Sequence, residues 1–290
     1  MQYALELTLS GIAIGSIYGL MAMAFALIYR STGILNFAQG EIGMLIAYIT
    51  WSINTAIGPS PWIIVLSTLV VSVVVGLVIE RLIMRRLLGE PVFSAVIVTI
   101  GLGVIIQAVV LMIWGGESRF LSLGRPDTFV DIMGTRLRES QIAVAVTLVV
   151  VLIGMWAFFK FSRFGIAMRA VAEDQRTARL MGISPKRVQS VAWAVSSLFA
   201  GMAGVFFAIT LDLSPILFTL GLKSFPATVV GGLDAVVGSG ASGILIGVIE
   251  NLVGGFIAPQ IKEIAGFVLI LVILMVRPFG LFGQKDIERV

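Results

Sequence analysis

The sequence predicts an all-α, polytopic integral membrane protein with about eight to nine transmembrane helices. Of its 290 residues, 58% are hydrophobic and only 12% are charged, and the mean hydropathy is +1.06. Soluble proteins carry about 25% charged residues, so this chain has too little charge to cover a globular surface. Several uncharged stretches also reach the roughly 20 residues that a helix needs to cross a bilayer. Both observations indicate a membrane protein.

The absence of cysteine and histidine excludes several classes of protein. Disulfides, zinc sites, haem ligation by either residue, and catalysis through Cys or His all need these side chains. We therefore expect no metal, no cofactor and no enzymatic activity. The net charge of +4 is small and scattered along the chain, so we expect no nucleic-acid partner.

Five long stretches contain no Asp, Glu, Lys or Arg, and they predict membrane spans: residues 7–29, 42–79, 91–116, 140–159 and 188–211. The second stretch is too long for one helix. Its Gly58-Pro59-Ser60-Pro61 sequence favours a turn, which predicts two spans, 42–57 and 62–79. In the last third, charged residues leave uncharged runs of only 10 to 15 residues: Asp212, Lys223, Asp234, Glu250, Lys262 and Glu263. Such short, glycine-interrupted runs predict discontinuous or re-entrant helices.

The basic residues predict the orientation, because cytoplasmic loops carry an excess of Lys and Arg. The segment 160–187 has seven basic residues against two acidic ones, so we expect it in the cytoplasm. Counting back through two spans puts the segment 80–90, with three arginines, on the same side. The segment 117–139 then lies outside. The C-terminal tail is expected in the cytoplasm because of three basic residues: Arg277, Lys285 and Arg289.

Glycines recur every four residues along the first span, at Gly11, Gly15 and Gly19. A ridge of small residues lets a second membrane helix approach closely. The spacing predicts helix packing, and packing within this chain is favoured over an interface with another subunit.

The segment from Phe164 to Ser190 predicts two helices joined by a corner. Arg169, Glu173 and Arg176 have the spacing of one helix face. The first helix is expected to stop at Gly182, and Ser184 and Pro185 suit the start of the next helix. This corner is either a solvated loop or an element that docks on a cytoplasmic partner. A partner would supply the phosphate-binding Gly-Lys-Ser/Thr loop that the chain lacks.

Four blocks of the sequence carry a resemblance to a known family. They are the run from Arg169 to Val188, the run Asn36-Phe37-Ala38-Gln39-Gly40-Glu41, the Lys- and Gly-rich region 223–243, and the closing run 277–283. Their order and spacing resemble those of LivH-type permeases, the membrane subunits of branched-chain amino acid ABC importers. Gln39 stands where some family members carry His.

The resemblance implies a single permease domain over residues 1–290 in the bacterial inner membrane, surrounded by lipid. It implies a second permease, for which a distinct LivM-type chain is favoured over a second copy. It further implies two cytoplasmic ABC ATPases and an extracytoplasmic solute-binding protein. Residues of the cytoplasmic segment 160–187 would then couple the permease to an ATPase: Arg169, Glu173, Asp174, Arg176 and Gly182.

Six residues are candidates for lining the translocation pathway: Asn36, Phe37, Gln39, Glu41, Thr99 and Gln107. For the segment 36–41, helix capping and anchoring are favoured over contact with a solute, because Asn36 can cap a turn and Glu41 suits a helix start. Thr99 and Gln107 are costly in lipid unless they face protein or water, and Gln107 is expected to join helices. Lys223 and Asp234 are either charges within the membrane or the two ends of a short helix, and the second interpretation is favoured.

Other functions stay open at this stage. The same importer class includes permeases for urea, amides or aromatic acids. An ion-coupled secondary transporter would need carboxylates within the membrane to bind ions. It is disfavoured because the glutamates lie near the ends of the predicted spans, as Glu41, Glu80 and Glu139 do. An intramembrane protease is disfavoured because it needs His or paired aspartates in a Gly-x-Gly-Asp motif, and Gly231-Gly232-Leu233-Asp234 matches that motif poorly.

Overall fold

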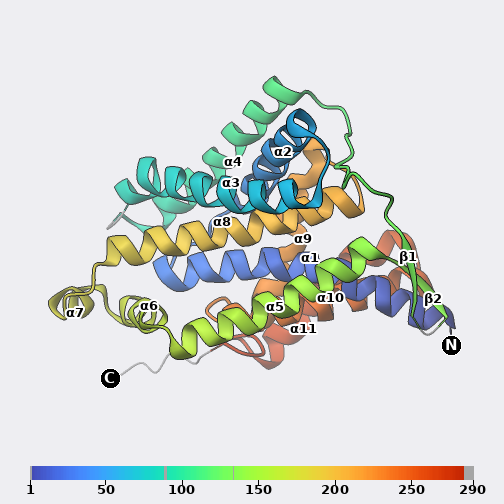
Figure 1. Cartoon of the computed structure of the whole chain (residues 1–290). Helices are drawn as coiled ribbons and strands as arrows, with labels where there is room; N and C mark the ends of the chain where they lie inside the picture. The colour runs from blue at the N-terminus through green and yellow to red at the C-terminus, as the bar shows by residue number, and fades with distance from the viewer. Residues whose placement is uncertain (1, 88–89, 133, 284–290) are drawn as a thin grey trace.

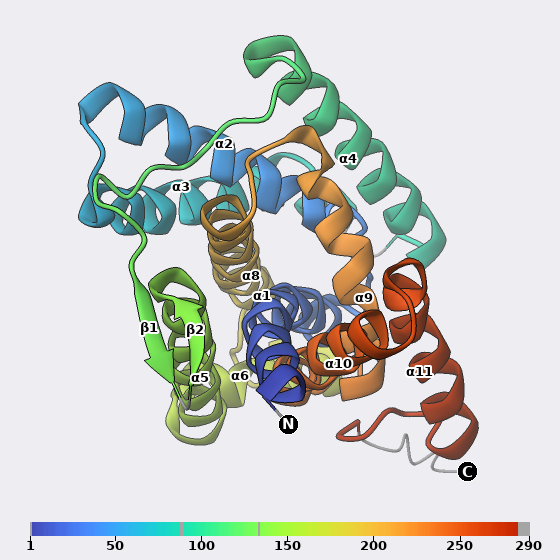
Figure 2. The ribbon, with the colours of Figure 1, turned by 90° about the vertical axis from the view of Figure 1, so that its right-hand side faces the viewer.

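The structure, a computed structural model, describes residues 2–87, 90–132 and 134–283. They form a bundle of helices around α1 (Gln2–Thr32). Figure 1 shows α6 and α7 at one end of the bundle and the N-terminus with a short hairpin at the opposite end. Seen along the bundle, α1 lies among α8, α10 and α5 (Figure 2). The most apolar window of α1 is 89% buried, against 22% for that of α5. The first helix is therefore the core of the fold rather than a lipid-facing helix.

The long uncharged stretch folds as α2 (Gln39–Ile57) and α3 (Pro61–Leu82), divided at the expected turn. Gly58 has a φ of +128°, a conformation that residues with a side chain rarely adopt, and Pro61 occupies the first turn of α3. The structure therefore agrees with the division of this stretch into two helices at 58–61.

The middle of the chain departs from an all-α fold at one place. After the short 3₁₀ helix η1 (Met84–Leu87) and α4 (Val92–Trp114), β1 (Phe129–Ile132) pairs antiparallel with β2 (Thr135–Arg138) before α5 (Glu139–Phe161) begins. The sequence analysis missed this hairpin. Phe129, Val130 and Ile132 favour extended backbone, and Gly134 supplies a φ of +81° at the turn. The signal is short and lies in a loop with many charged residues.

The corner segment contains two short helices before α8 (Pro185–Thr210), rather than one: α6 (Arg163–Glu173) and α7 (Gln175–Leu180). Gly182, with a φ of +81°, ends this segment as expected, and Pro185 begins α8. Ser184 precedes α8 in an extended conformation, but its side chain makes no capping hydrogen bond. The single helix face expected for Arg169, Glu173 and Arg176 is wrong, because the chain breaks at Asp174.

The last third contains η2 (Pro215–Phe218), α9 (Thr219–Gly231), α10 (Val236–Phe256), η3 (Pro259–Ile261) and α11 (Lys262–Val276). The prediction of short pieces holds for α9 and α11. It fails for α10, which continues without a break past Glu250. The helix can hold this acid because the side chain is buried inside the protein and has a partner there. Lys223 lies in α9 and Asp234 follows the end of that helix. In the C-terminal tail, Arg277 follows α11, whereas Lys285 and Arg289 lie outside the described residues.

Among the described residues, six helical stretches are long and apolar enough to cross a membrane: 2–32, 61–87, 92–114, 139–161, 185–210 and 236–256. Two further apolar helical stretches, 215–231 and 264–276, are shorter. The lengths agree with a polytopic membrane protein and do not by themselves establish eight or nine spans.

The glycines of α1 face those of α10 at backbone contact. A Cβ atom on Gly11 would lie 2.7 Å from the Cα of Val248, and one on Gly15 would lie 2.6 Å from the carbonyl oxygen of Gly243. A Cβ atom on Gly19 would lie 2.5 Å from the carbonyl oxygen of Gly240. Real Cβ atoms do not approach backbone so closely, so each of these positions needs glycine. The ridge lies inside the chain.

Candidate functional site

The chain turns back into the bundle after α1, so that α2 begins beside the middle of other helices. The Gln39 side-chain amide donates to the Ser196 hydroxyl at 3.0 Å, and that hydroxyl donates to the carbonyl oxygen of Ala24 at 2.8 Å. Ala24 lies eight residues before the end of α1, which corresponds to about 12 Å along the helix. The helix α2 therefore starts inside the protein rather than at its surface.

Asn36 holds the turn that precedes α2. Its side-chain nitrogen donates to the Gln39 side-chain oxygen at 2.6 Å, and its oxygen accepts from the backbone N–H of Ala38 at 3.1 Å. Ala38 occupies the N-cap position of α2 and makes no side-chain hydrogen bond there. Asn36 therefore does not cap α2 as expected, and instead holds the turn that precedes the helix. Asn36 and Gln39 are both almost fully buried. Their polar groups are thus engaged within the chain.

The start of α2 also contacts α4. The Thr99 hydroxyl accepts from the backbone N–H of Phe37 at 3.2 Å, and Thr99 is fully buried. A Cβ atom on Gly103 would lie 3.1 Å from the carboxylate carbon of Glu41, so a bare backbone on α4 makes room for this acid. Phe37 remains 38% exposed. Gln107 lies two turns further along α4, half-buried, and makes no side-chain hydrogen bond to the described residues.

The start of α9 meets the start of α2. A Cβ atom on Gly40 would lie 3.0 Å from the backbone nitrogen of Gly221, and it would also clash with the carbonyl oxygen of Phe218. The Phe225 ring of α9 lies 6.2 Å from the ring of Phe25 and 6.3 Å from that of Phe37. Two helices therefore begin side by side inside the bundle, with aromatic rings around them.

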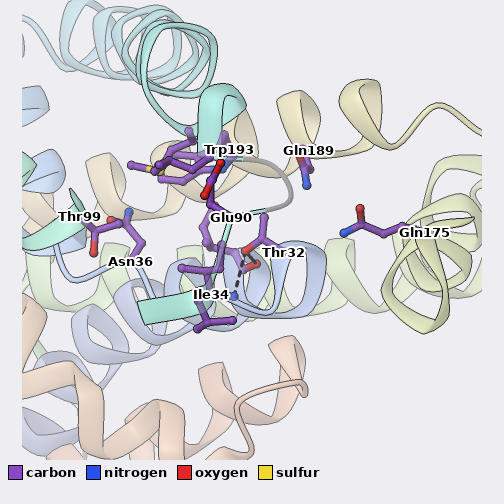
Figure 3. A pocket seen from close by; sticks show the side chains of 12 residues that line it. Thr32, Ile34, Asn36, Glu90, Thr99, Gln175, Gln189 and Trp193 are labelled. Carbon is purple, nitrogen blue, oxygen red and sulfur yellow. Dashed lines mark hydrogen bonds between the residues drawn. The ribbon is translucent and has the colours of Figure 1, made fainter. Parts of the chain in front are cut away.

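A cavity of about 250 Å³ connects this region with the corner segment. Asn36 and Thr99 line one end, whereas Gln175 of α7 and Gln189 of α8 line the other (Figure 3). Glu90, Thr32 and Trp193 lie between these ends. The cavity therefore joins two of the candidate pathway residues to the helix that follows Asp174.

The corner segment presents its charged residues to solvent. Arg169, Glu173, Asp174, Arg176 and Gly182 are all exposed. Beyond them, Leu180 is 89% exposed and Met181 is 77% exposed, although both are large and apolar. Val171 and Ala178 are buried and hold the segment to the bundle. The corner is thus anchored on one side and has an apolar tip on the other.

Asp174 forms the junction between α6 and α7. Its carboxylate accepts from the Thr177 hydroxyl at 2.6 Å and from the backbone N–H of Arg176 at 2.7 Å. These two hydrogen bonds stabilise the charged form and lower the pKa of Asp174. The carboxylate therefore caps α7 and fixes the angle of the corner.

Asp174→Ala is expected to loosen α7 at pH 7, because the cap is lost, and to speed amide hydrogen exchange in residues 175–180. Because the pKa is lowered, the carboxylate stabilises α7 above its ordinary pKa of 3.8, and this contribution disappears as the pH falls through the lowered value. Asp174→Asn is the matched control, since Asn caps helices about as well as Asp and does not titrate. Equal exchange in the Ala variant and the wild type would contradict the assignment of the cap.

An ion pair at the end of α3 is tied to the start of α8 by a hydrogen bond. The Arg85 guanidinium donates to both carboxylate oxygens of Glu80 at 2.9 Å and to the Ser190 hydroxyl at 2.9 Å. Glu80 is 1% exposed. The two arginine-rich segments, 80–90 and 160–187, therefore lie at the same end of the bundle, as their charge predicts.

The chain matches the family described as the branched-chain amino acid transport system permease component over residues 7–276. It belongs to this family. It is 28% identical to the high-affinity branched-chain amino acid transport system permease protein LivH of Salmonella typhimurium, covering 99% of this chain and 98% of LivH. It is 29% identical to BraD of Pseudomonas aeruginosa, with the same coverage. The resemblance to LivH-type permeases is confirmed.

The chain is also similar to a second type of permease. This protein is 28% identical to the permease LivM of Escherichia coli, over 67% of this chain and 53% of LivM. No solved structure matches the chain significantly.

The sequence analysis missed several residues of this region. Leu180 and Met181 were not expected to form an exposed tip. Two large apolar residues beside Gly182, in an otherwise charged segment, could have indicated an apolar contact surface. Gln175 and Gln189 gave no signal, because a glutamine in a polar helix is usually solvated. Gln175 reaches the cavity from α7, which begins after the break at Asp174.

Proposed function

We propose that this chain is the membrane-spanning permease subunit of an ATP-binding-cassette importer in the bacterial inner membrane. It would form half of a translocation pathway for branched-chain or related amino acids, delivered by an extracytoplasmic solute-binding protein. The observation that carries the proposal is the family match over residues 7–276, combined with an exposed two-helix corner at one end of the bundle.

The corner supports coupling to a cytoplasmic ATPase. Leu180 and Met181 are apolar side chains on a surface that otherwise carries charge, and a partner cleft would remove them from water. The coupling residues are those of the same segment: Arg169, Glu173, Asp174, Arg176 and Gly182. Because Gln175 of α7 also lines the cavity, a shift of this corner would change the cytoplasmic end of the pathway. Partner ATPases would drive alternating access in this way.

The pathway itself would run past the inner start of α2. Its candidate residues are Asn36, Phe37, Gln39, Glu41, Thr99 and Gln107. Phe37 is the most exposed of them, whereas the buried Asn36, Gln39 and Thr99 support the start of α2. Discontinuous helices are the usual way in which transporters bring backbone and polar groups to the middle of a membrane. The half-exposed aromatic ring suits weak contact with an apolar side chain.

The partners follow from the family. Its LivM-type members favour a heterodimer with a second, distinct permease, together with two ATPases. Counting α2, α9 and α11 with the six long helical stretches gives nine membrane-embedded helices. The corner and the arginine-rich segment 80–90 face the cytoplasm in this arrangement, as does the C-terminus.

The test is transport by vesicles that contain this chain, its LivM-type partner and both ATPases, with the solute-binding protein added on the side opposite the ATPases. We expect uptake of radiolabelled leucine that requires ATP and every component. Vesicles with this chain alone should take up none, and ion-driven uptake by them would instead identify a secondary transporter. If the vesicles took up urea, short amides or aromatic acids but no leucine, the chain would belong to an importer of the same class with a different solute.

A further inference from the structure

A second hollow lies on the side of the bundle away from the start of α2. It is an apolar groove of about 440 Å³ between α3, α5 and α8, lined by Ile64, Leu69, Ala143, Met202, Val205 and Phe206. On each helix the lining covers about two turns, from the end that carries the hairpin: 61–69, 139–147 and 202–209. Two turns correspond to about 11 Å of depth. The groove therefore runs inward along the helices from one surface of the bundle.

A fixed loop covers the outer end of the groove. Figure 2 shows the connection from α4 passing across the ends of α2 and α3 before it reaches β1. Gly124, with a φ of +74°, packs against the backbone of Pro59, and the Asn54 side chain donates to the carbonyl oxygen of Ser122 at 2.9 Å. Asp127 accepts from the backbone N–H and the hydroxyl of Ser140 at 3.0 and 2.6 Å. The mouth of the groove is thus built from contacts to α2, to the turn before α3 and to α5.

Three charged side chains line this mouth. Arg125 donates to the Glu139 carboxylate at 2.6 Å, and the Thr128 hydroxyl donates to the other oxygen of Glu139 at 3.0 Å. The Arg125 side chain is 57% exposed, and the described residues engage one of its five N–H donors. With Asp127 and Glu139 the mouth carries a net charge of −1. It offers free donors to an anion beside carboxylates that attract a cation.

We propose that this groove binds one phospholipid with a zwitterionic headgroup, of the phosphatidylethanolamine type. One acyl chain fills the apolar groove, the phosphate accepts from Arg125, and the ammonium group lies near Glu139 and Asp127. Water is a poor occupant, because apolar cavities stay dry. An anionic lipid is a poor occupant because the mouth is already negative.

The place of the groove favours a lipid over a second permease. The α3 and α5 helices that flank it lie on one side of the bundle, whereas α4, α9 and α11 lie on the other (Figure 2). The inner starts of α2 and α9, where a pathway between two subunits would run, are on the α4 and α9 side. The α3 and α5 helices carry long exposed apolar faces, including Val70 and Val150, as α4 and α11 do on the other side. A face of this kind suits the bilayer.

The test is lipid titration of the purified full-length chain in detergent, followed by native mass spectrometry. The probes are palmitoyl-oleoyl phosphatidylethanolamine and the phosphatidylglycerol with the same chains. We expect one ethanolamine lipid to bind about tenfold more tightly than the glycerol lipid. Ala143→Trp fills the groove from the exposed face of α5 and should weaken binding about tenfold. Val149→Trp, on another face of α5 and 48% exposed, is the matched control and should bind like wild type.

Arg125→Gln keeps the test independent of any folding defect in the tryptophan variant, because Arg125 lies at the surface. It should lower the affinity for the ethanolamine lipid severalfold. Equal affinity for the two lipids, or wild-type binding by Ala143→Trp, would overturn the proposal. The chain has no cysteine, so Ala143→Cys gives a unique cross-linking site. Its cross-linking to the partner permease in membranes would identify a protein interface instead.

Discussion

Gly243→Leu is expected to prevent the chain from reaching its folded state. Gly243 lies against the backbone of Gly19 in α1, and a Cβ atom there would also lie 2.7 Å from the carbonyl oxygen of Gly15. Overpacking a core costs about 1–3 kcal/mol when side chains can move. Here the neighbours are backbone atoms, so the cost should exceed that range. The measurement is the yield and thermal midpoint of the detergent-solubilised protein by size-exclusion chromatography with fluorescence detection.

The control is the same substitution in another helix. Gly154 lies in the middle of α5 and is exposed, and a Cβ atom there meets nothing within 4 Å. Gly154→Leu should therefore fold at least as well as wild type, since leucine has the higher helix propensity. If both variants behaved alike, close packing of α1 on α10 would not be what holds the bundle together.

Leu180→Asp combined with Met181→Asp is expected to abolish ATP-dependent uptake while the bundle stays folded. Both side chains are almost fully exposed, so the isolated chain should lose little stability. In a docked complex the new carboxylates would be buried without partners, which is strongly unfavourable. We expect at least about a tenfold loss of uptake. Co-purification of the ATPases with the permease should fall in parallel.

Leu211→Asp provides the comparison at the opposite end of the bundle, where the side chain is also exposed. It makes the same chemical change away from the corner and should leave ATPase association intact. Normal uptake by the double variant at the corner would remove the apolar tip from the coupling mechanism. Loss of uptake with intact ATPase binding would restrict its role to the transmission of movement.

The spans could be predicted because their signals are local. An uncharged stretch of sufficient length, a Gly-Pro turn at 58–61 and a proline at 185 each act within a few residues. The break at Asp174 was harder to predict, because Asp, Thr and Arg at 174–177 are compatible with a continuous exposed helix. Glu250 was misread for a different reason. Its charge is accommodated by tertiary packing inside the bundle, which a window of sequence does not contain.

The candidate site could be predicted only in part. The sequence marks Asn36, Gln39 and Thr99 as polar residues in an apolar setting, and the structure brings all three together. Their depth was not predictable, because the same residues would equally suit a turn at the membrane surface. What decides the depth is the bond from Gln39 to Ser196, between positions 157 residues apart. Long-range contacts of this kind have no signature in one sequence.

The buried position of α1 also constrains how the protein is made. The helix is synthesised before α10, yet its glycine face matches α10, from which it is separated by residues 33–235. Until then the face of Gly11, Gly15 and Gly19 must be covered by lipid or by a temporary protein contact. Membrane helices insert first and associate afterwards, so the α1–α10 pair closes the structure late. A chain truncated before α10 would insert normally and still leave its central helix without its partner.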